Sequence, residues 1–145
     1  MPDFSLLTRS ACATLQKVLG MDVSILSTQE EYEVSAAALG FYGAYNGTLT
    51  LLLAADSVRL TADMLLKIFH IETPVEDSLV FAEFLNIFAG NLATELKRRG
   101  VTMNIHAPGA TQSYEPPDSN PQALTLRCAD GPVFTFCFYL KEISQ

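Results

Sequence analysis

The chain has 145 residues, of which 49% are hydrophobic and 17% charged, a composition that indicates a folded domain and argues against disorder. Its formal net charge of −7 argues against nucleic acid and anionic membranes as partners, because both are negatively charged and bind basic surfaces. We therefore expect one domain over residues 1–145, with no nucleic-acid or membrane partner.

The beginning of the sequence and its cysteines indicate a reducing compartment. Residues 1–10 lack the basic start and long apolar centre of a secretory signal. The longest apolar run, residues 49–55, is too short to span a bilayer. Cys12, Cys128 and Cys137 form no CxxC motif and no paired framework. We expect a cytoplasmic protein.

The first half of the chain predicts one helix followed by three strands. The helix is expected at residues 4–19 and the strands at 22–27, 33–43 and 46–55. Gly20 is placed to end the helix. Gly43 and the pair Asn46-Gly47 indicate a hairpin turn between the two longer strands.

The second half predicts two helices and then three strands. The helices are expected at residues 58–69 and 78–99, and the strands at 101–108, 122–130 and 132–142, with a loop at 113–121. Asp56 and Ser57 offer capping groups to the first of these helices. Gly100 is placed to end the second, and Asp130-Gly131 to join the last two strands.

The predicted order is therefore α, β, β, β, α, α, β, β, β, with short connections. We expect an α+β domain: a mostly antiparallel sheet of about six strands covered by about three helices, in two halves related by a pseudo-twofold.

Motifs for metal binding and for self-contained catalysis are missing from the sequence. His70 and His106 lie far from each other, with no HExxH spacing. The glycines form no phosphate-binding loop, and no GxSxG elbow is present. We expect no metal site in this chain.

The predicted helix at 78–99 has two contrasting faces. One is an apolar ridge, formed by Phe81, Leu85, Phe88, Leu92 and Leu96. The other is a polar stripe, formed by Glu83, Asn86, Gly90, Thr94 and Lys97. Such a helix buries one side and presents the other to solvent.

Glu83 and Asn86 are the candidate functional pair on this stripe. A Glu-x-x-Asn spacing occurs by chance in about one chain in three of this length, so the spacing alone decides little. Gly90 follows one turn later, where a missing side chain admits a partner's backbone, and Leu79 and Ile87 place apolar groups beside the pair. These features leave two interpretations open, a protein-docking helix and an ordinary surface helix.

Residues 82–96, AEFLNIFAGNLATEL, resemble the signature helix of the CheX-like chemotaxis phosphatases, the family of CheX, CheC and FliY. The shared pattern is a Glu-x-x-Asn followed by a Gly-Asn pair, here Gly90 and Asn91. The opening helix, the strands through VSAAALGFYGAYNGTLTLLLA, the helix through Met64 and Leu65, and the strand ending at Pro108 follow the family's order. The resemblance covers most of the chain.

The resemblance implies a phosphatase that acts on the aspartyl phosphate of CheY-type receiver domains. Asn86 matches the asparagine that orients the attacking water, and Glu83 matches the glutamate that engages the partner's active-site lysine. Mg²⁺ is expected in the partner's acidic pocket, so this chain needs no cofactor of its own. Leu79, Ile87, Gly90 and Asn91 are expected partner-binding residues, with Gly90 and Asn91 serving helix shape or contacts rather than chemistry.

Two departures from the family pattern modify these expectations. Residues 6–20 carry no Glu-x-x-Asn, so we expect one site, as in CheX, rather than the two of CheC-type members. CheX-type proteins form dimers through sheet edges, so a homodimer is expected. The strand at 132–142 is placed equally well at such an edge or in the centre of the sheet. A non-catalytic adaptor that binds a receiver domain or flagellar-switch component through the same helix is the alternative function.

Overall fold

The computed structural model describes residues 4–26, 34–71, 76–106, 122–129 and 131–142. Its elements in chain order are α1 (Phe4–Leu19), β1 (Val23–Leu26), β2 (Val34–Gly43), β3 (Tyr45–Leu53), the 3₁₀ helix η1 (Ala55–Ser57), α2 (Val58–Ile68), α3 (Asp77–Arg98), β4 (Met103–Ile105), β5 (Gln122–Cys128) and β6 (Val133–Glu142). This order of helices and strands confirms the prediction. The predicted loop at 113–121 and Asp130 lie outside the described residues.

The six strands form one sheet in the order β1-β5-β6-β3-β2-β4, and all its neighbours are antiparallel. β6 lies in the centre, between β5 and β3. Of the edge and central placements expected for the strand at 132–142, the central one is therefore correct. If β1 is exchanged with β4, β2 with β5 and β3 with β6, the order becomes β4-β2-β3-β6-β5-β1. This is the observed order read from the opposite edge of the sheet. The strand order therefore has the predicted pseudo-twofold relation between the halves.

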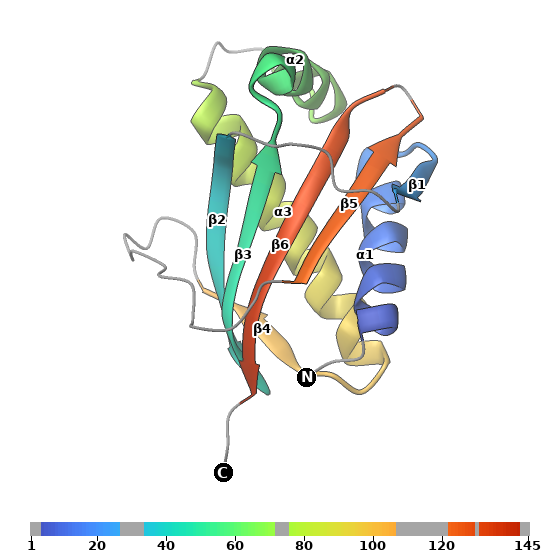
Figure 1. The fold of residues 1–145 in the computed structure, drawn as a ribbon, viewed down its shortest axis with the longest axis vertical. Helices are drawn as coiled ribbons and strands as arrows, with labels where there is room; N and C mark the ends of the chain where they lie inside the picture. Colours follow the sequence, from blue (N-terminus) through green and yellow to red (C-terminus); the bar gives the residue numbers. More distant parts are fainter. Residues whose placement is uncertain (1–3, 27–33, 72–75, 107–121, 130, 143–145) are drawn as a thin grey trace.

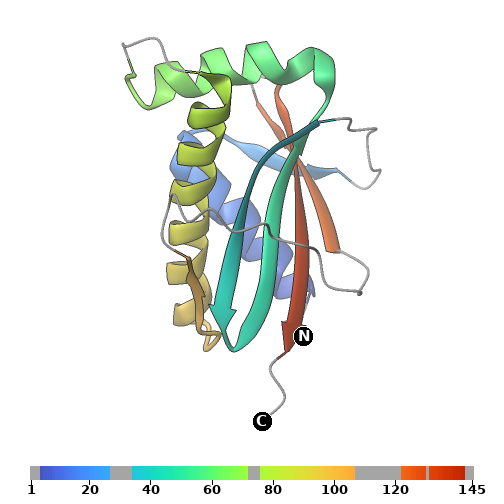
Figure 2. The same cartoon turned by 90° about the vertical axis from the view of Figure 1, so that its left-hand side faces the viewer.

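The sheet is covered by helices on one face. Figures 1 and 2 show α1 and α3 side by side on that face, with α2 lying across the end from which α3 starts. Successive strand residues point to opposite faces, and the side chains directed toward the helices are apolar and buried: Leu49, Leu51, Leu53, Leu124, Leu126, Phe134, Phe136 and Phe138. They form one core with the buried face of α3.

Aromatic packing fixes α3 on the sheet. The rings of Phe88 and Phe136 are stacked with centroids 4.3 Å apart, and those of Phe84 and Phe134 are 5.1 Å apart. All four side chains are fully buried. Burying such a side chain stabilises a fold by about 1.5–3 kcal/mol, and offset ring pairs add about 0.5–1.5 kcal/mol each. This contact determines which face of α3 is left for solvent.

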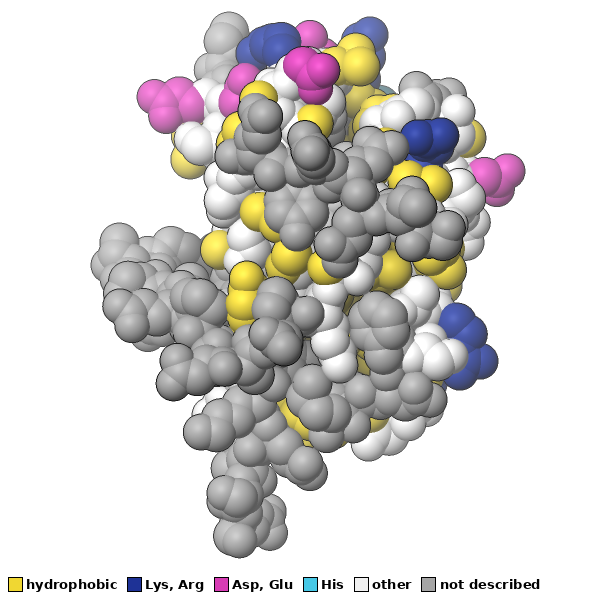
Figure 3. All heavy atoms as spheres, viewed as in Figure 1, with side chains coloured by type: hydrophobic (Ala, Val, Ile, Leu, Met, Phe, Trp, Pro, Cys, Tyr) yellow, Lys and Arg dark blue, Asp and Glu magenta, His cyan; other side chains and the backbone are white. Residues whose placement is uncertain are grey.

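The other face of the sheet carries smaller and more polar side chains. The hydroxyls of Thr125 and Thr135 lie 3.2 Å apart on adjacent strands. Figure 3 shows this face: hydrophobic side chains are visible along the strands, and charged side chains gather at the end that carries α2. The alternation of apolar and mixed faces explains why the strands were detectable from sequence.

The first hairpin confirms its prediction at Gly43 and differs from it at Asn46-Gly47. Asn46 and Gly47 lie inside β3, paired with β6, and are not turn residues. The turn is made at Gly43, which has a φ of 124°. A Cβ on Gly43 would lie 2.9 Å from the carbonyl oxygen of Thr102, so both conformation and space require glycine there.

The cap of α2 also differs from its prediction. Ser57 stands at the N-cap but makes no side-chain capping bond. Its hydroxyl donates instead to the carbonyl oxygen of Ala54, at 2.9 Å. The 3₁₀ turn η1 leads directly into the helix, which makes this local bond available to the hydroxyl.

Both ends of α3 are anchored. At its start, Asp77 accepts a 2.8 Å hydrogen bond from Arg59 of α2. At its end, Gly100 adopts a φ of 87°, and the Val101 N–H donates to the carbonyl oxygen of Leu96 at 2.9 Å. This is the glycine-dependent helix termination that the sequence predicted.

By length and composition α3 is also apolar enough to cross a membrane: it has 22 residues, and an 18-residue window of it has a mean hydropathy of 1.3. The core helix of a globular domain meets the same criterion. Eight of its side chains are buried and belong to the core shared with the sheet. Its apolar character is therefore explained by packing within the domain.

His70 provides a test of how the helix ends contribute to stability. It follows α2 with a φ of 56°, a left-handed conformation that costs a non-glycine residue about 1–2 kcal/mol. We expect His70→Gly to raise the free energy of unfolding by about 0.5–1 kcal/mol, measured by urea denaturation. Gly100→His, at the corresponding position of α3, is expected to lower it. A loss of stability in His70→Gly would show that the imidazole makes a compensating contact.

Candidate functional site

Glu83 and Asn86 lie on the face of α3 that points away from the sheet. Glu83 is exposed and Asn86 is half-buried, whereas Phe84 and Leu85 between them are buried in the core. The pair therefore projects from a helix whose other side is fixed by packing. Their position is set by the backbone of a core element rather than by a loop, which favours a defined geometry.

Neither side chain of this pair is engaged by the protein itself. Among the described residues, no hydrogen bond or ion pair is formed by the side chain of Glu83 or Asn86. Some other polar side chains of the same helix are engaged: Thr94 donates to the carbonyl oxygen of Gly90, and Glu95 pairs with Arg99. The carboxylate and the amide of the pair thus remain available to a group from outside.

The surroundings of the pair are partly apolar. Leu79 is 59% exposed and Ile87 is half-buried. At about 100° per residue, these two side chains lie within about 40° of Glu83 around the helix axis. Of the described large hydrophobic side chains, Leu79 is among the four most exposed. An exposed apolar group beside unpaired polar groups is typical of a protein-contact surface.

Gly90 and Asn91 occupy different positions on the helix. Gly90 lies within about 20° of Glu83, and Asn91 about 80° away. The Asn91 side-chain amide donates to the carbonyl oxygen of Ile87 at 2.8 Å. This bond gives Asn91 a role in the helix itself, and its role as a partner contact stays a prediction.

A glycine in a helix interior costs about 1 kcal/mol relative to alanine. Beyond the backbone of its own helix, a Cβ built on Gly90 would meet no atom of the described residues within 4 Å. The surface next to the candidate pair is therefore open, at some cost to the stability of the helix.

The described part of the chain shows no group of three or more His, Cys, Asp or Glu side chains placed to hold a metal ion. The cysteines are free thiols. Burial raises the pKa of the Cys12 thiol, and its Sγ–H donates to the carbonyl oxygen of Val23 at 3.6 Å. A raised pKa disfavours the nucleophilic thiolate, so Cys12 has a structural role.

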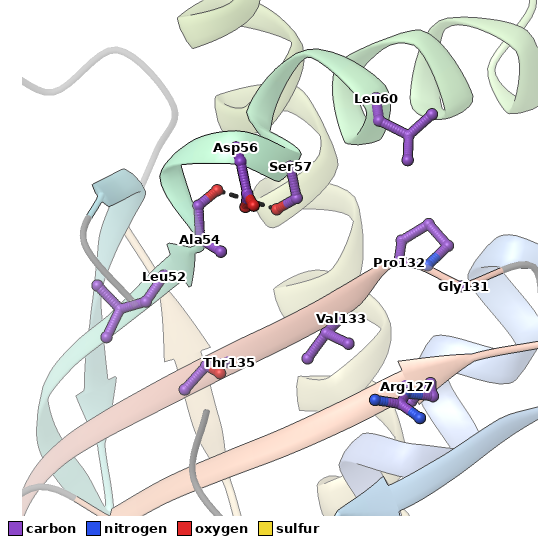
Figure 4. Close-up of a pocket in the computed structure, with 10 residues that line it drawn as sticks. All are labelled: Leu52, Ala54, Asp56, Ser57, Leu60, Arg127, Gly131, Pro132, Val133 and Thr135. Carbon is purple, nitrogen blue, oxygen red and sulfur yellow. Dashed lines mark hydrogen bonds between the residues drawn. The ribbon is translucent and has the colours of Figure 1, made fainter. Parts of the chain in front are cut away.

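One pocket of about 260 Å³ lies on the opposite face of the sheet from Glu83 and Asn86. Figure 4 shows its lining, which comes from the end of β3, the start of α2 and the β5–β6 hairpin: Leu52, Ala54, Asp56, Ser57, Leu60, Arg127, Gly131, Pro132, Val133 and Thr135. This pocket was not predicted from the sequence, because its residues are distant in the chain and form no motif. It contains no His or Cys and does not communicate with the candidate pair.

Comparisons with known proteins identify the fold. No protein-family model and no curated protein matches the sequence. Solved structures do match over almost the whole chain, at low sequence identity. A CheX chemotaxis protein from Desulfovibrio desulfuricans aligns with a TM-score of 0.63 and 18% identity, covering 94% of this chain and 97% of that one.

Two further structures extend the comparison. A chain from the CheX–CheY–BeF₃–Mg²⁺ complex of Borrelia burgdorferi aligns with a TM-score of 0.58 and 17% identity, covering 98% of this chain and 100% of that one. FliY from Thermotoga maritima aligns with a TM-score of 0.52 and 20% identity, covering 94% and 84%.

The chain has the fold of the CheX, CheC-like and FliY chemotaxis proteins. The resemblance inferred from residues 82–96 is thereby confirmed for the fold. The roles of Glu83, Asn86 and their neighbours are not decided by a likeness at this level of identity.

The unpaired state of Glu83 and Asn86 leads to an expectation for stability. We expect Glu83→Gln and Asn86→Ala to change the free energy of unfolding by less than about 0.5 kcal/mol, because neither substitution removes a bond within the described chain. Phe88→Ala, on the buried side of the same helix, is expected to cost about 3–5 kcal/mol. Urea unfolding measures all three. A large loss for Asn86→Ala would assign this amide to the fold and not to a site.

Proposed function

We propose that this protein is a phosphatase that hydrolyses the aspartyl phosphate of a CheY-type receiver domain. The observation that carries the proposal is the pair of unengaged side chains, Glu83 and Asn86, on the exposed face of a core helix. The fold supports it, since CheX proteins share that fold and one of them was crystallised in a complex with CheY, BeF₃ and Mg²⁺.

The chemistry demands little of the catalyst. An aspartyl phosphate is a reactive acyl phosphate, so hydrolysis is limited mainly by the placement of water and the distribution of charge. The water oxygen forms a new bond to phosphorus while the bond to the aspartyl oxygen breaks. The products are dihydrogen phosphate, which carries both protons of the water, and a free carboxylate on the partner.

In this proposal Asn86 orients the water. A carboxamide is not a base at neutral pH, but it can donate one hydrogen bond and accept another, which fixes the direction of a bound water. Because Phe84 and Phe88 hold the helix on the sheet, the amide is presented from a rigid backbone. That rigidity reduces the entropy lost on reaching the reactive geometry.

Glu83 has a different role, since it binds rather than reacts. Its exposed carboxylate is suited to pair with the active-site lysine of the receiver, and charge-assisted hydrogen bonds of this kind are stronger than neutral ones. The pair would fix the receiver relative to Asn86, which lies three residues away on the same helix. Leu79, Ile87 and Gly90 form the contact surface around it, and Mg²⁺ comes with the receiver's acidic pocket.

The assembly is also part of the proposal. We propose a homodimer, and because β6 is central, pairing through a sheet edge must use β1 or β4 at the ends of the observed strand order. The alternative function, an adaptor that binds a receiver or flagellar-switch component without hydrolysis, uses the same surface of α3 and predicts binding without phosphate release.

Asn86→Ala tests the catalytic role directly. We expect the stimulated rate of phosphate release from a phosphorylated receiver to fall by about 100-fold or more, because the attacking water loses its orienting group. Release of inorganic phosphate over time measures this. Asn46→Ala, at an exposed asparagine of β3 inside the sheet, is the matched control and is expected to retain activity. Full activity in Asn86→Ala would contradict the mechanism, and binding without release by the wild type would favour the adaptor.

Glu83→Gln tests engagement of the partner. The substitution keeps the shape and removes the charge, so we expect the KM for the phosphorylated receiver to rise by about 10-fold with a smaller change in kcat. Glu95→Gln removes an equal charge from another side of α3, where Glu95 pairs with Arg99, and is expected to leave KM unchanged. Unchanged affinity and unchanged rate in Glu83→Gln would together remove its assigned role.

A further inference from the structure

The glycines of this chain differ in whether their backbone conformation excludes other residues. Of the five whose surroundings the structure describes, Gly20, Gly43, Gly100 and Gly131 have φ values from 69° to 124°. Side chains rarely adopt such conformations, so the fold itself explains these four glycines. Gly90 is the exception, because it has no positive φ, and beyond its own helix backbone no atom of the described residues lies within 4 Å of a built Cβ.

Among the described residues, nothing therefore requires a glycine at position 90. The helix α3 continues through it without interruption from Asp77 to Arg98, so Gly90 does not serve as a helix break. Alanine would fit the space and would favour the helix. A residue that weakens its own helix, and whose missing side chain leaves a space that no described atom fills, is best explained by something that contacts it from outside.

The position of Gly90 relates it to the candidate pair. It follows Asn86 by four residues, which places it one turn along the same face and about 6 Å further along the axis. The carbonyl oxygens of Ile87 and Gly90 are already bonded to Asn91 and Thr94, respectively. The surface there is bare backbone with few groups left for hydrogen bonding, which suits close van der Waals packing.

We propose that Gly90 is the point at which the main chain of the receiver domain crosses α3 in direct contact. Side chains ordinarily keep packed helices about 8–10 Å apart, and glycine allows a closer approach of backbones. This approach brings the phosphorylated residue within reach of the short side chain of Asn86. The inference rests on the proposed function and specifies its docking geometry, making Gly90 a specificity-determining contact.

Substitutions of increasing size at Gly90 separate stability from docking. We expect Gly90→Ala to raise Tm by about 3 °C and yet to lower kcat/KM for phosphate release by several-fold. Gly90→Leu is expected to lower kcat/KM by about 100-fold, because it displaces the reacting groups by more than 1 Å. Ala13→Leu, at an exposed position of α1, adds the same side chain elsewhere and is expected to leave kcat/KM unchanged.

The affinity of each variant for a beryllofluoride-loaded receiver should be measured beside its rate and its Tm. A higher Tm with weaker binding supports the inference. If Gly90→Leu keeps wild-type affinity and rate, or if Gly90→Ala lowers Tm, the inference is overturned while the proposed function stands. If the wild type neither binds the receiver nor accelerates phosphate release, the proposed function itself fails, and this inference fails with it.

Discussion

The packing of one helix against the centre of the sheet is the interaction on which the rest of this structure depends. Phe84 and Phe88 lie on Phe134 and Phe136, with the Phe88 and Phe136 rings only 4.3 Å apart. This contact joins α3 to β6, the central strand, and fixes the rotation of α3 about its axis. Because the buried face is fixed, the exposed face is fixed as well, and Glu83 and Asn86 lie on it.

The same helix therefore serves as core element and as candidate site. A loop would have to be ordered before it could position a water, whereas α3 is already held by eight buried side chains. In the proposed mechanism the partner supplies most of the reacting groups, so this chain needs few of its own. The proposal assigns the phosphate, the metal ion and the lysine to the partner, and leaves to α3 the placement of one carboxylate, one amide and a surface that a second backbone can approach.

If the receiver docks as proposed, stability and docking are in opposition at Gly90. Along α3, Asn91 and Thr94 bond to backbone carbonyls and Gly100 closes the helix with a φ of 87°, all features that serve the helix itself. Gly90 serves no such purpose within the described chain and costs about 1 kcal/mol relative to alanine. A helix shaped only for stability would not contain it.

The sequence by itself determined the elements and the candidate pair. Period-two and period-3.6 patterns gave the order of strands and helices, and the spacing of Glu83 and Asn86 placed them on one face, because both inferences depend on local geometry alone. It failed at Asn46-Gly47 and at Ser57, where tertiary pairing with β6 and a preceding 3₁₀ turn overrode local preference. Only the tertiary structure decided that β6 is central, that the pair has no partner within the described chain, and that Gly90 faces open space. Those facts depend on contacts between segments distant in the sequence, which no local pattern records.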